Sequence, residues 1–242
     1  RNTPLPADVL DAMPSVISVS RVAVDIRNID VEAASRAGIL VTQASRTWVP
    51  AVAELVIGLM IDAARGISRA NVGYKQGVMP EIRMGRQLHG ATAGVIGYGP
   101  LGRRVVELAL AFGMTVLVHD PYATVERGDV RQVALDELLG KADFVLPLAV
   151  ATEETENLID ARALSLMKHD ALLINLSRGN LIDEAALERA LDEGRIGGAA
   201  MDVGRAPDQM PSLQLARRED VSATPHIGGL TREAIEGQAL ET

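Results

Sequence analysis

The hydrophobic and polar positions of the chain follow two alternating periods from residue 91 onward. Short runs made almost wholly of apolar residues alternate with longer stretches in which apolar side chains recur at helical spacing. The runs predict strands at 92–97, 114–120, 131–133, 143–149, 171–177, 196–203 and 221–225, and the stretches predict helices at 100–113, 135–142, 160–167 and 183–194. Strands without a polar face that alternate with helices are typical of an α/β fold, a doubly wound parallel sheet covered on both faces.

The chain before residue 91 predicts a smaller unit and a long connecting helix. Residues 15–20 and 38–42 are β-branched runs, and 29–38 has the pattern of a helix that ends at Gly38. Residues 49–77 carry a helical pattern with a proline in its first turn. Apolar positions occupy most of its circumference, so we expect one long helix buried on several sides, between domains or subunits.

Composition narrows the class of protein. The 242 residues suffice for one large domain or two small ones, and 48% hydrophobic with 23% charged residues is ordinary for a globular protein. A net charge of −8 and only 2% aromatic residues argue against a nucleic-acid partner. The longest apolar stretch is interrupted by Glu54 and is too short to span a bilayer, and there is no cysteine. We expect a cytoplasmic protein with no membrane partner and no metal site.

A glycine-rich turn lies between the strand 92–97 and the helix 100–113. Gly97, Gly99 and Gly102 form a G-x-G-x-x-G motif, and Asp120 ends the next strand eighteen residues after Gly102. This context favours dinucleotide binding over a ligand-free turn, with a tight turn at the first glycine, close pyrophosphate approach at the second and close packing at the third. An acid at position 120 accepts from ribose hydroxyls and repels a 2′-phosphate, which favours NAD over NADP.

Two further strand ends carry candidate chemistry. Arg178 follows the strand 171–177, and His226 follows the strand 221–225. A planar guanidinium clamps a carboxylate, and an imidazole donates or accepts a proton, which together suit hydride transfer between a 2-hydroxy acid and NAD. The alternatives are a surface arginine in a turn and a histidine with a packing or capping role. His89, His119 and His169 are interpreted as surface or structural residues.

These motifs together resemble the D-isomer-specific 2-hydroxyacid dehydrogenases, the phosphoglycerate dehydrogenase-like family. The resemblance covers nearly the whole chain and is carried by NIDVEAASRAGILVT, AVAEL, GVIGYGPLGRRV, VHDPY, LINLSRGNLIDEAAL, GGAAMDV and TPHIGGLTREA. It implies catalytic roles for Arg178 and His226 and a homodimer built on the long helix. It also implies cofactor contacts from Gly97, Tyr98, Gly99, Pro100, Leu101, Gly102, Asp120, Pro121, Arg178, Asp202, His226 and Gly228.

The resemblance further implies two Rossmann-like domains with a cleft between them. Residues 49–230 are expected to be the NAD-binding domain, including the long helix. Residues 1–48, with 231–242 returning toward them, are expected to be a partial substrate-binding domain of Rossmann-like or flavodoxin-like fold. Compared with the family, we expect the opening strands of that domain and the terminal helix to be absent, either because this sequence is truncated at both ends or because the substrate domain is only partly represented.

Two positions depart from the family pattern. The family carries a Glu that pairs with the catalytic histidine, and direct alignment puts Pro207 there. Asp208 takes the role if the loop shifts by one residue; otherwise it is a solvated loop acid. In the loop that holds the substrate carboxylate, Ala23 and Asp25 replace the expected glycines, and Arg21 or Arg27 is needed to offset the acid. The substrate is therefore left open.

We expect an enzyme that interconverts a 2-hydroxy acid and its 2-keto acid with NAD as cofactor. The alternative is an NAD(H)-binding sensor or corepressor-like protein with little turnover. The presence of both Arg178 and His226 favours the enzyme, whereas the missing Glu and the altered carboxylate loop favour the sensor.

Overall fold

The computed structural model of the chain describes residues 3–21, 26 and 28–240 in two compact units. Residues up to Ala51, together with those from Gly229 onward, form the smaller unit, and Val52–Gly228 form the larger one. The expectations about Ala23, Asp25 and Arg27 lie outside the described residues.

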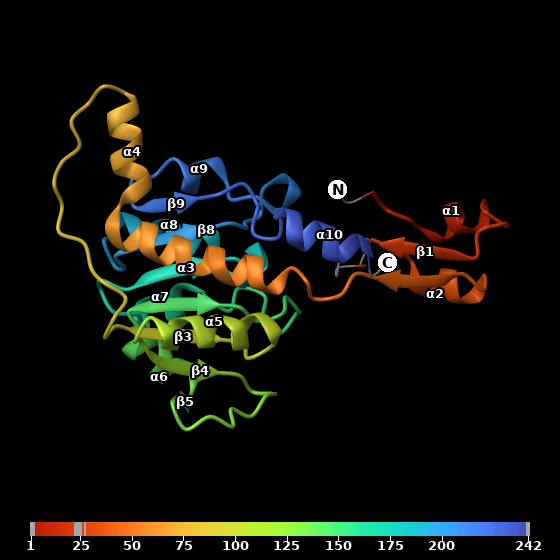
Figure 1. Cartoon of the computed structure of the whole chain (residues 1–242), viewed down its shortest axis with the longest axis horizontal. Helices are drawn as coiled ribbons and strands as arrows, with labels where there is room; N and C mark the ends of the chain where they lie inside the picture. Colours follow the sequence, from red (N-terminus) through yellow and green to blue (C-terminus); the bar gives the residue numbers. More distant parts are fainter. Residues whose placement is uncertain (1–2, 22–25, 27, 241–242) are drawn as a thin grey trace. The chain divides into compact units, whose positions relative to one another are not determined.

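The larger unit is built on a seven-stranded sheet in which every neighbouring pair of strands is parallel (Figure 1). The order is β5-β4-β3-β6-β7-β8-β9. The strands are β3 (Thr92–Ile96), β4 (Thr115–His119), β5 (Val130–Gln132), β6 (Phe144–Pro147), β7 (Leu172–Asn175), β8 (Gly198–Met201) and β9 (Val221–Ala223). The strand order reverses between β3 and β6, which is the position where doubly wound sheets bind ligands. The predicted Rossmann-type fold is confirmed.

Helices cover this sheet and bury its central strands completely. They are α5 (Pro100–Ala111), α6 (Leu135–Lys141), α7 (Ala161–Leu166), α8 (Glu184–Asp192) and the short α9 (Leu213–Ala216). Every residue of β6, β7 and β8 is buried, as expected for strands covered on both faces. Asp160 and Asp183 cap α7 and α8, because each side chain accepts a hydrogen bond from a backbone N–H in the first turn.

The prediction of one long helix over 49–77 is wrong. The structure has α3 (Val49–Arg65) and α4 (Ile67–Lys75), separated by Gly66 in the left-handed conformation with φ of 65°. The Asp62 carboxylate holds this break by accepting hydrogen bonds from the Ser68 N–H at 2.7 Å and from the Ser222 hydroxyl of β9. No residue of α4 is buried, so the expected burial applies to α3 and not to its continuation.

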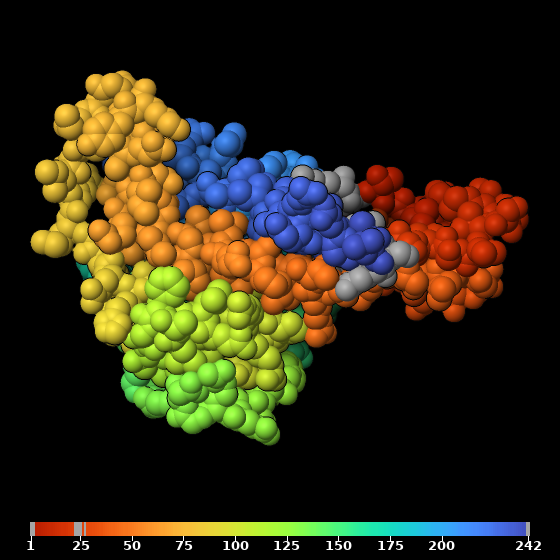
Figure 2. All heavy atoms as spheres, in the orientation of Figure 1, coloured from red at the N-terminus to blue at the C-terminus, as the bar shows by residue number. Residues whose placement is uncertain are grey.

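The segment that follows α4 runs without regular structure from 76 to 91. Figure 2 shows α4 and this segment, in yellow, standing out from the rest of the larger unit. Its apolar side chains Val78, Met79, Ile82 and Met84 are exposed, the last two fully so, whereas Leu88 is buried.

The smaller unit contains α1 (Ala7–Asp11), β1 (Ser18–Arg21), α2 (Val31–Arg36), β2 (Leu40–Gln43) and α10 (Arg232–Leu240). β1 and β2 pair in parallel, and α2 ends near Gly38, which has a φ of 71°. A small core forms around Leu10, Ala33, Ala34 and Ile39. Within the described ranges, every helix is too short or too polar to cross a bilayer.

Candidate active site

The predicted cofactor and catalytic residues of the larger unit lie at one edge of its sheet. The strands are parallel, so their carboxyl ends meet there, and five of the seven are followed by a predicted residue: Gly97 after β3, Asp120 after β4, Arg178 after β7, Asp202 after β8 and His226 after β9. In parallel α/β sheets, ligands bind outside this edge.

The three glycines of the turn after β3 each meet a different constraint. Gly97 has a φ of 99°, and a Cβ there would lie 2.7 Å from the backbone of Ala149. A Cβ on Gly102 would lie 2.0 Å from the carbonyl oxygen of Gly97, so α5 packs directly on the turn. Gly99 precedes α5 and has nothing within 4 Å of its Cβ position. Open space in front of a helix N-terminus fits a pyrophosphate.

Asp120 joins the end of β4 to this turn. Its carboxylate accepts hydrogen bonds from the backbone N–H groups of Tyr98 at 2.6 Å, Tyr122 at 2.8 Å and Ala123 at 2.9 Å. Burial opposes ionisation, but these three donors outweigh it and lower the pKa of Asp120. The group is therefore an ionised carboxylate with lone pairs left to accept from ribose hydroxyls.

The other residues predicted to contact the cofactor around this turn differ in how much of their side chains is exposed. Gly99, Pro100 and Pro121 are exposed, whereas the side chains of Tyr98 and Leu101 are buried. The latter two therefore offer a ligand their backbone rather than their side chains.

Arg178 is held by a buried asparagine that sequence reasoning missed. Asn175 ends β7, and its side-chain NH₂ donates to the Arg178 carbonyl at 2.9 Å while its side-chain oxygen accepts from the Ser177 N–H at 3.1 Å. The Ser177 hydroxyl donates to the Ala149 carbonyl at 2.9 Å, which ties this turn to the loop after β6. The sequence offered one sign of this role: Asn175 is a polar residue at the end of an otherwise apolar run, and a buried amide needs hydrogen-bond partners.

Asp202 shapes the turn that contains His226. It is almost fully buried, and its carboxylate accepts from the Thr224 hydroxyl at 2.6 Å and from the backbone N–H groups of Ile227 and Gly228 at 2.9 and 2.8 Å. His226 has a φ of 55°, a strained conformation for a residue with a side chain. The three bonds to Asp202 hold that conformation, a structural role beyond the predicted cofactor contact.

His226 contacts Asp208 through the backbone and not through the carboxylate that the shifted-loop hypothesis expected. The His226 Nδ1 atom lies 2.9 Å from the Asp208 carbonyl oxygen. Asp208 and Gln209 both have a φ of 58°, so two consecutive left-handed residues set the direction of this loop. A carbonyl only accepts, so Nδ1 carries the proton and Nε2 of the neutral ring is an acceptor.

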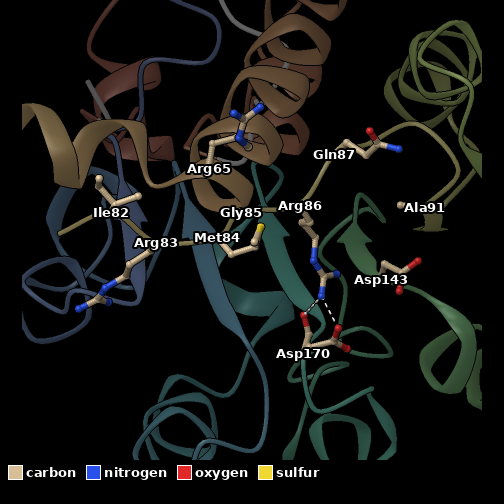
Figure 3. A pocket seen from close by; sticks show the side chains of 10 residues that line it. All are labelled: Arg65, Ile82, Arg83, Met84, Gly85, Arg86, Gln87, Ala91, Asp143 and Asp170. Atoms are coloured by element: carbon tan, nitrogen blue, oxygen red, sulfur yellow. Dashed lines mark hydrogen bonds and ion pairs between the residues drawn. The ribbon is translucent and has the colours of Figure 1, made fainter. Parts of the chain in front are cut away.

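A hollow of about 1040 Å³ lies at the opposite, amino-terminal edge of the sheet (Figure 3). Its lining includes Ala91, Asp143 and Asp170, which precede β3, β6 and β7, and the segment 82–87. Arg86 crosses it and donates to the Asp170 carboxylate and carbonyl. None of the predicted cofactor or catalytic residues lines this hollow.

Comparisons with known proteins identify the family of the chain. Residues 57–228 match the family described as D-isomer specific 2-hydroxyacid dehydrogenase, NAD binding domain. The chain is 40% identical over 239 residues to D-3-phosphoglycerate dehydrogenase of Methanocaldococcus jannaschii, with 96% of this chain and 45% of that protein covered. It is 35% identical over 244 residues to hydroxypyruvate reductase of Thermotoga maritima, with 99% and 79% covered.

A solved structure shares the fold over almost the whole chain. The D-lactate dehydrogenase of Aquifex aeolicus, complexed with NAD and lactic acid, is 30% identical with a TM-score of 0.83 and covers 98% of this chain and 77% of its own. The chain spans about half the length of the phosphoglycerate dehydrogenase that it matches. The motifs, the parallel sheet and these matches agree: the chain belongs to the D-isomer-specific 2-hydroxyacid dehydrogenase family and carries its NAD-binding domain.

Proposed function

We propose that the protein is an NAD-dependent oxidoreductase that interconverts a 2-hydroxy acid and its 2-keto acid. The observation that carries this proposal is the meeting of a glycine loop, a guanidinium and an oriented imidazole at one edge of one sheet. Bound NAD supplies the hydride acceptor, and NADH the hydride donor, for the C2 atom of the substrate.

Arg178 is proposed as the substrate clamp. A guanidinium presents parallel N–H donors that match a carboxylate, and it polarises a neighbouring keto oxygen. Asn175 supports this role, because it fixes the backbone of the turn on which Arg178 sits.

His226 is proposed as the acid/base. In reduction the protonated ring gives a proton from Nε2 to the oxygen on C2, and in oxidation the neutral ring takes it back. The Asp208 carbonyl supports this role by accepting from Nδ1, which leaves Nε2 for the substrate. On this proposal Asp208 acts through its backbone.

The smaller unit is proposed to be part of the substrate-binding domain, with residues 49–230 as the cofactor domain. We also propose a homodimer whose interface includes α4 and the segment 78–84. Four apolar side chains of that segment are exposed (Val78, Met79, Ile82 and Met84), and no residue of α4 is buried. Exposed apolar clusters of this kind mark interaction surfaces. A cytoplasmic location stays a prediction.

The second candidate function is an NAD(H) sensor with little turnover. The absence of an ion pair between His226 and Asp208 in the described structure favours it, since a carbonyl stabilises an imidazolium less than a carboxylate does.

The test is NADH oxidation with a panel of 2-keto acids that includes glyoxylate, pyruvate, hydroxypyruvate and phosphohydroxypyruvate. Turnover of one or more of them, lost in His226→Asn, is the expected result. Binding of NADH without turnover on any member of the panel would favour the sensor instead.

A further inference from the structure

Arg205 lies where three of the strand-end loops meet. Its guanidinium donates to the Asn157 side chain at 2.5 Å, to the Asn180 carbonyl at 3.1 Å and to the Ile182 carbonyl at 3.2 Å. It also forms an ion pair with Glu156 at 2.8 Å. These partners come from the loop after β6 and from the turn after β7, whereas Arg205 itself belongs to the loop after β8.

The backbone around Arg205 binds the same neighbours. Its N–H donates to the Glu184 carboxylate at 2.9 Å, at the start of α8. A Cβ on Gly179 would lie 2.3 Å from the carbonyl carbon and oxygen of Gly204, so the turn of Arg178 and the loop of Arg205 touch backbone to backbone. The two segments therefore pack as one body.

Two backbone hydrogen bonds within the loop after β8 fix the segment that contacts His226. The Gly204 N–H donates to the Gln209 carbonyl at 2.8 Å, and the Ala206 N–H donates to the Met210 carbonyl at 3.1 Å. Between these bonds lies Asp208, whose carbonyl accepts from His226. Arg205 and the carbonyl that accepts from His226 therefore belong to one hydrogen-bonded loop.

We propose that Arg205 is a positioning residue that fixes the Arg178 turn and the Asp208 carbonyl relative to each other. Through these two contacts it sets the orientation of the guanidinium and the proton-bearing nitrogen of His226. Its catalytic consequence rests on the proposed function, but its effect on the histidine does not. The planar fork is essential, because one side chain must reach two carbonyls and two side chains at once.

The experiment compares Arg205→Gln and Arg205→Lys with the matched control Arg218→Gln. Arg218 also pairs with two acids, Asp192 and Asp220, but at the far end of α8 and before β9. The readouts are the tautomer of His226 from ¹⁵N NMR, with the signal assigned by His226→Asn, and the NADH dissociation constant. The kcat/KM is measured with the keto acid that the parent reduces fastest.

We expect Arg205→Gln to move His226 from the Nδ1–H tautomer toward the Nε2–H tautomer and to lower kcat/KM roughly tenfold or more, as misplaced catalytic groups do. NADH affinity stays within about twofold, because the glycine loop is not part of the contact. Arg205→Lys keeps the charge but loses the planar guanidinium, so we expect a tautomer change smaller than in Arg205→Gln. The lysine variant also serves as the test if Arg205→Gln does not fold. Arg218→Gln should lower thermal stability without changing the tautomer.

An unchanged tautomer in both Arg205 variants overturns the proposal, whether or not the protein turns over any keto acid. The same tautomer shift in Arg218→Gln also overturns it, because the effect would then be general loosening. If the tautomer shifts in the Arg205 variants alone while the parent binds NADH without turning over any keto acid, the positioning role stands and the proposed function fails.

Discussion

The backbone N–H of Tyr98 donates a 2.6 Å hydrogen bond to the carboxylate of Asp120. The acid expected to receive the ribose of the cofactor thus also fastens the middle of the glycine turn from the neighbouring strand. We therefore expect this one side chain to link the choice of cofactor to the shape of the turn that is predicted to hold the pyrophosphate.

Cofactor preference follows from the charge at that position. NADH should bind more tightly than NADPH, because an ionised Asp120 repels a 2′-phosphate. Asp120→Asn should narrow the difference and weaken NADH binding, whereas Asp136→Asn, an exposed acid on α6, should change neither. Calorimetric titration of the parent and both variants with NADH and NADPH measures these affinities. Equal or tighter binding of NADPH by the parent contradicts the role of Asp120.

The stability of the protein should depend on Asp120 in a defined pH window. Its folded pKa is lowered from the ordinary 3.8 by the three backbone donors, despite burial. Its contribution is therefore fully present above 3.8 and is lost as the pH falls through the lower folded value. Urea unfolding should give a difference between parent and Asp120→Asn that is constant from neutral pH downward and shrinks below 3.8. A difference that grows on acidification would contradict this assignment.

Two glycine substitutions should separate folding from cofactor binding. Gly99→Ala adds a methyl group where no atom lies within 4 Å, so thermal stability should change little while NADH binding falls strongly. Gly102→Ala places the same group 2.0 Å from the Gly97 carbonyl, so both stability and binding should fall. Thermal melts and NADH titrations distinguish the two outcomes. Normal NADH affinity in Gly99→Ala would place the pyrophosphate elsewhere.

Replacement of Arg178 should affect the substrate step alone. Arg178→Lys keeps the charge but loses the planar fork, so kcat/KM should drop by about tenfold or more while NADH affinity is nearly unchanged. Arg217→Lys, at an exposed arginine after α9, serves as the control. Steady-state kinetics and NADH titration of both variants give the comparison. An unaltered kcat/KM in Arg178→Lys would return Arg178 to a surface role.

The two directions of the reaction should respond oppositely to pH through His226. Reduction needs the protonated ring and oxidation the neutral ring, and His226→Asn should depress both by roughly a hundredfold or more. Asp208→Asn should leave both pH–rate profiles in place, because the backbone carbonyl makes the contact and asparagine tolerates the left-handed conformation. If the pH–rate profile of the reduction shifted in Asp208→Asn, the Asp208 carboxylate would after all act on His226.

Much of the architecture was predictable from the sequence because it depends on local patterns. Most strands of the parallel sheet are short, largely apolar and separated by helices, of which two have recognisable caps in Asp160 and Asp183. The glycine turn was equally predictable, since each of its glycines answers a separate steric need within a few residues.

The errors and omissions arose where distant contacts decide. The helical pattern continues through Gly66, and only the bonds from Asp62 to Ser68 and Ser222 show why the chain turns there. The partner of His226 is a backbone carbonyl oxygen, and such a contact cannot be predicted from the type of residue that makes it. Arg205 went unnoticed for a related reason, because two of the four partners of its guanidinium are main-chain carbonyls of other loops.

The backbone of Gly204 leaves no room for a side chain on Gly179, and the backbones of Met210 and Pro211 leave none on Gly204 itself. A change of backbone in the turn after β7 therefore requires a matching change in the loop after β8. A graft from a relative with another substrate should transfer both segments as a single cassette. Exchange of one alone would meet a steric mismatch at this junction, however well its own residues suit the new substrate.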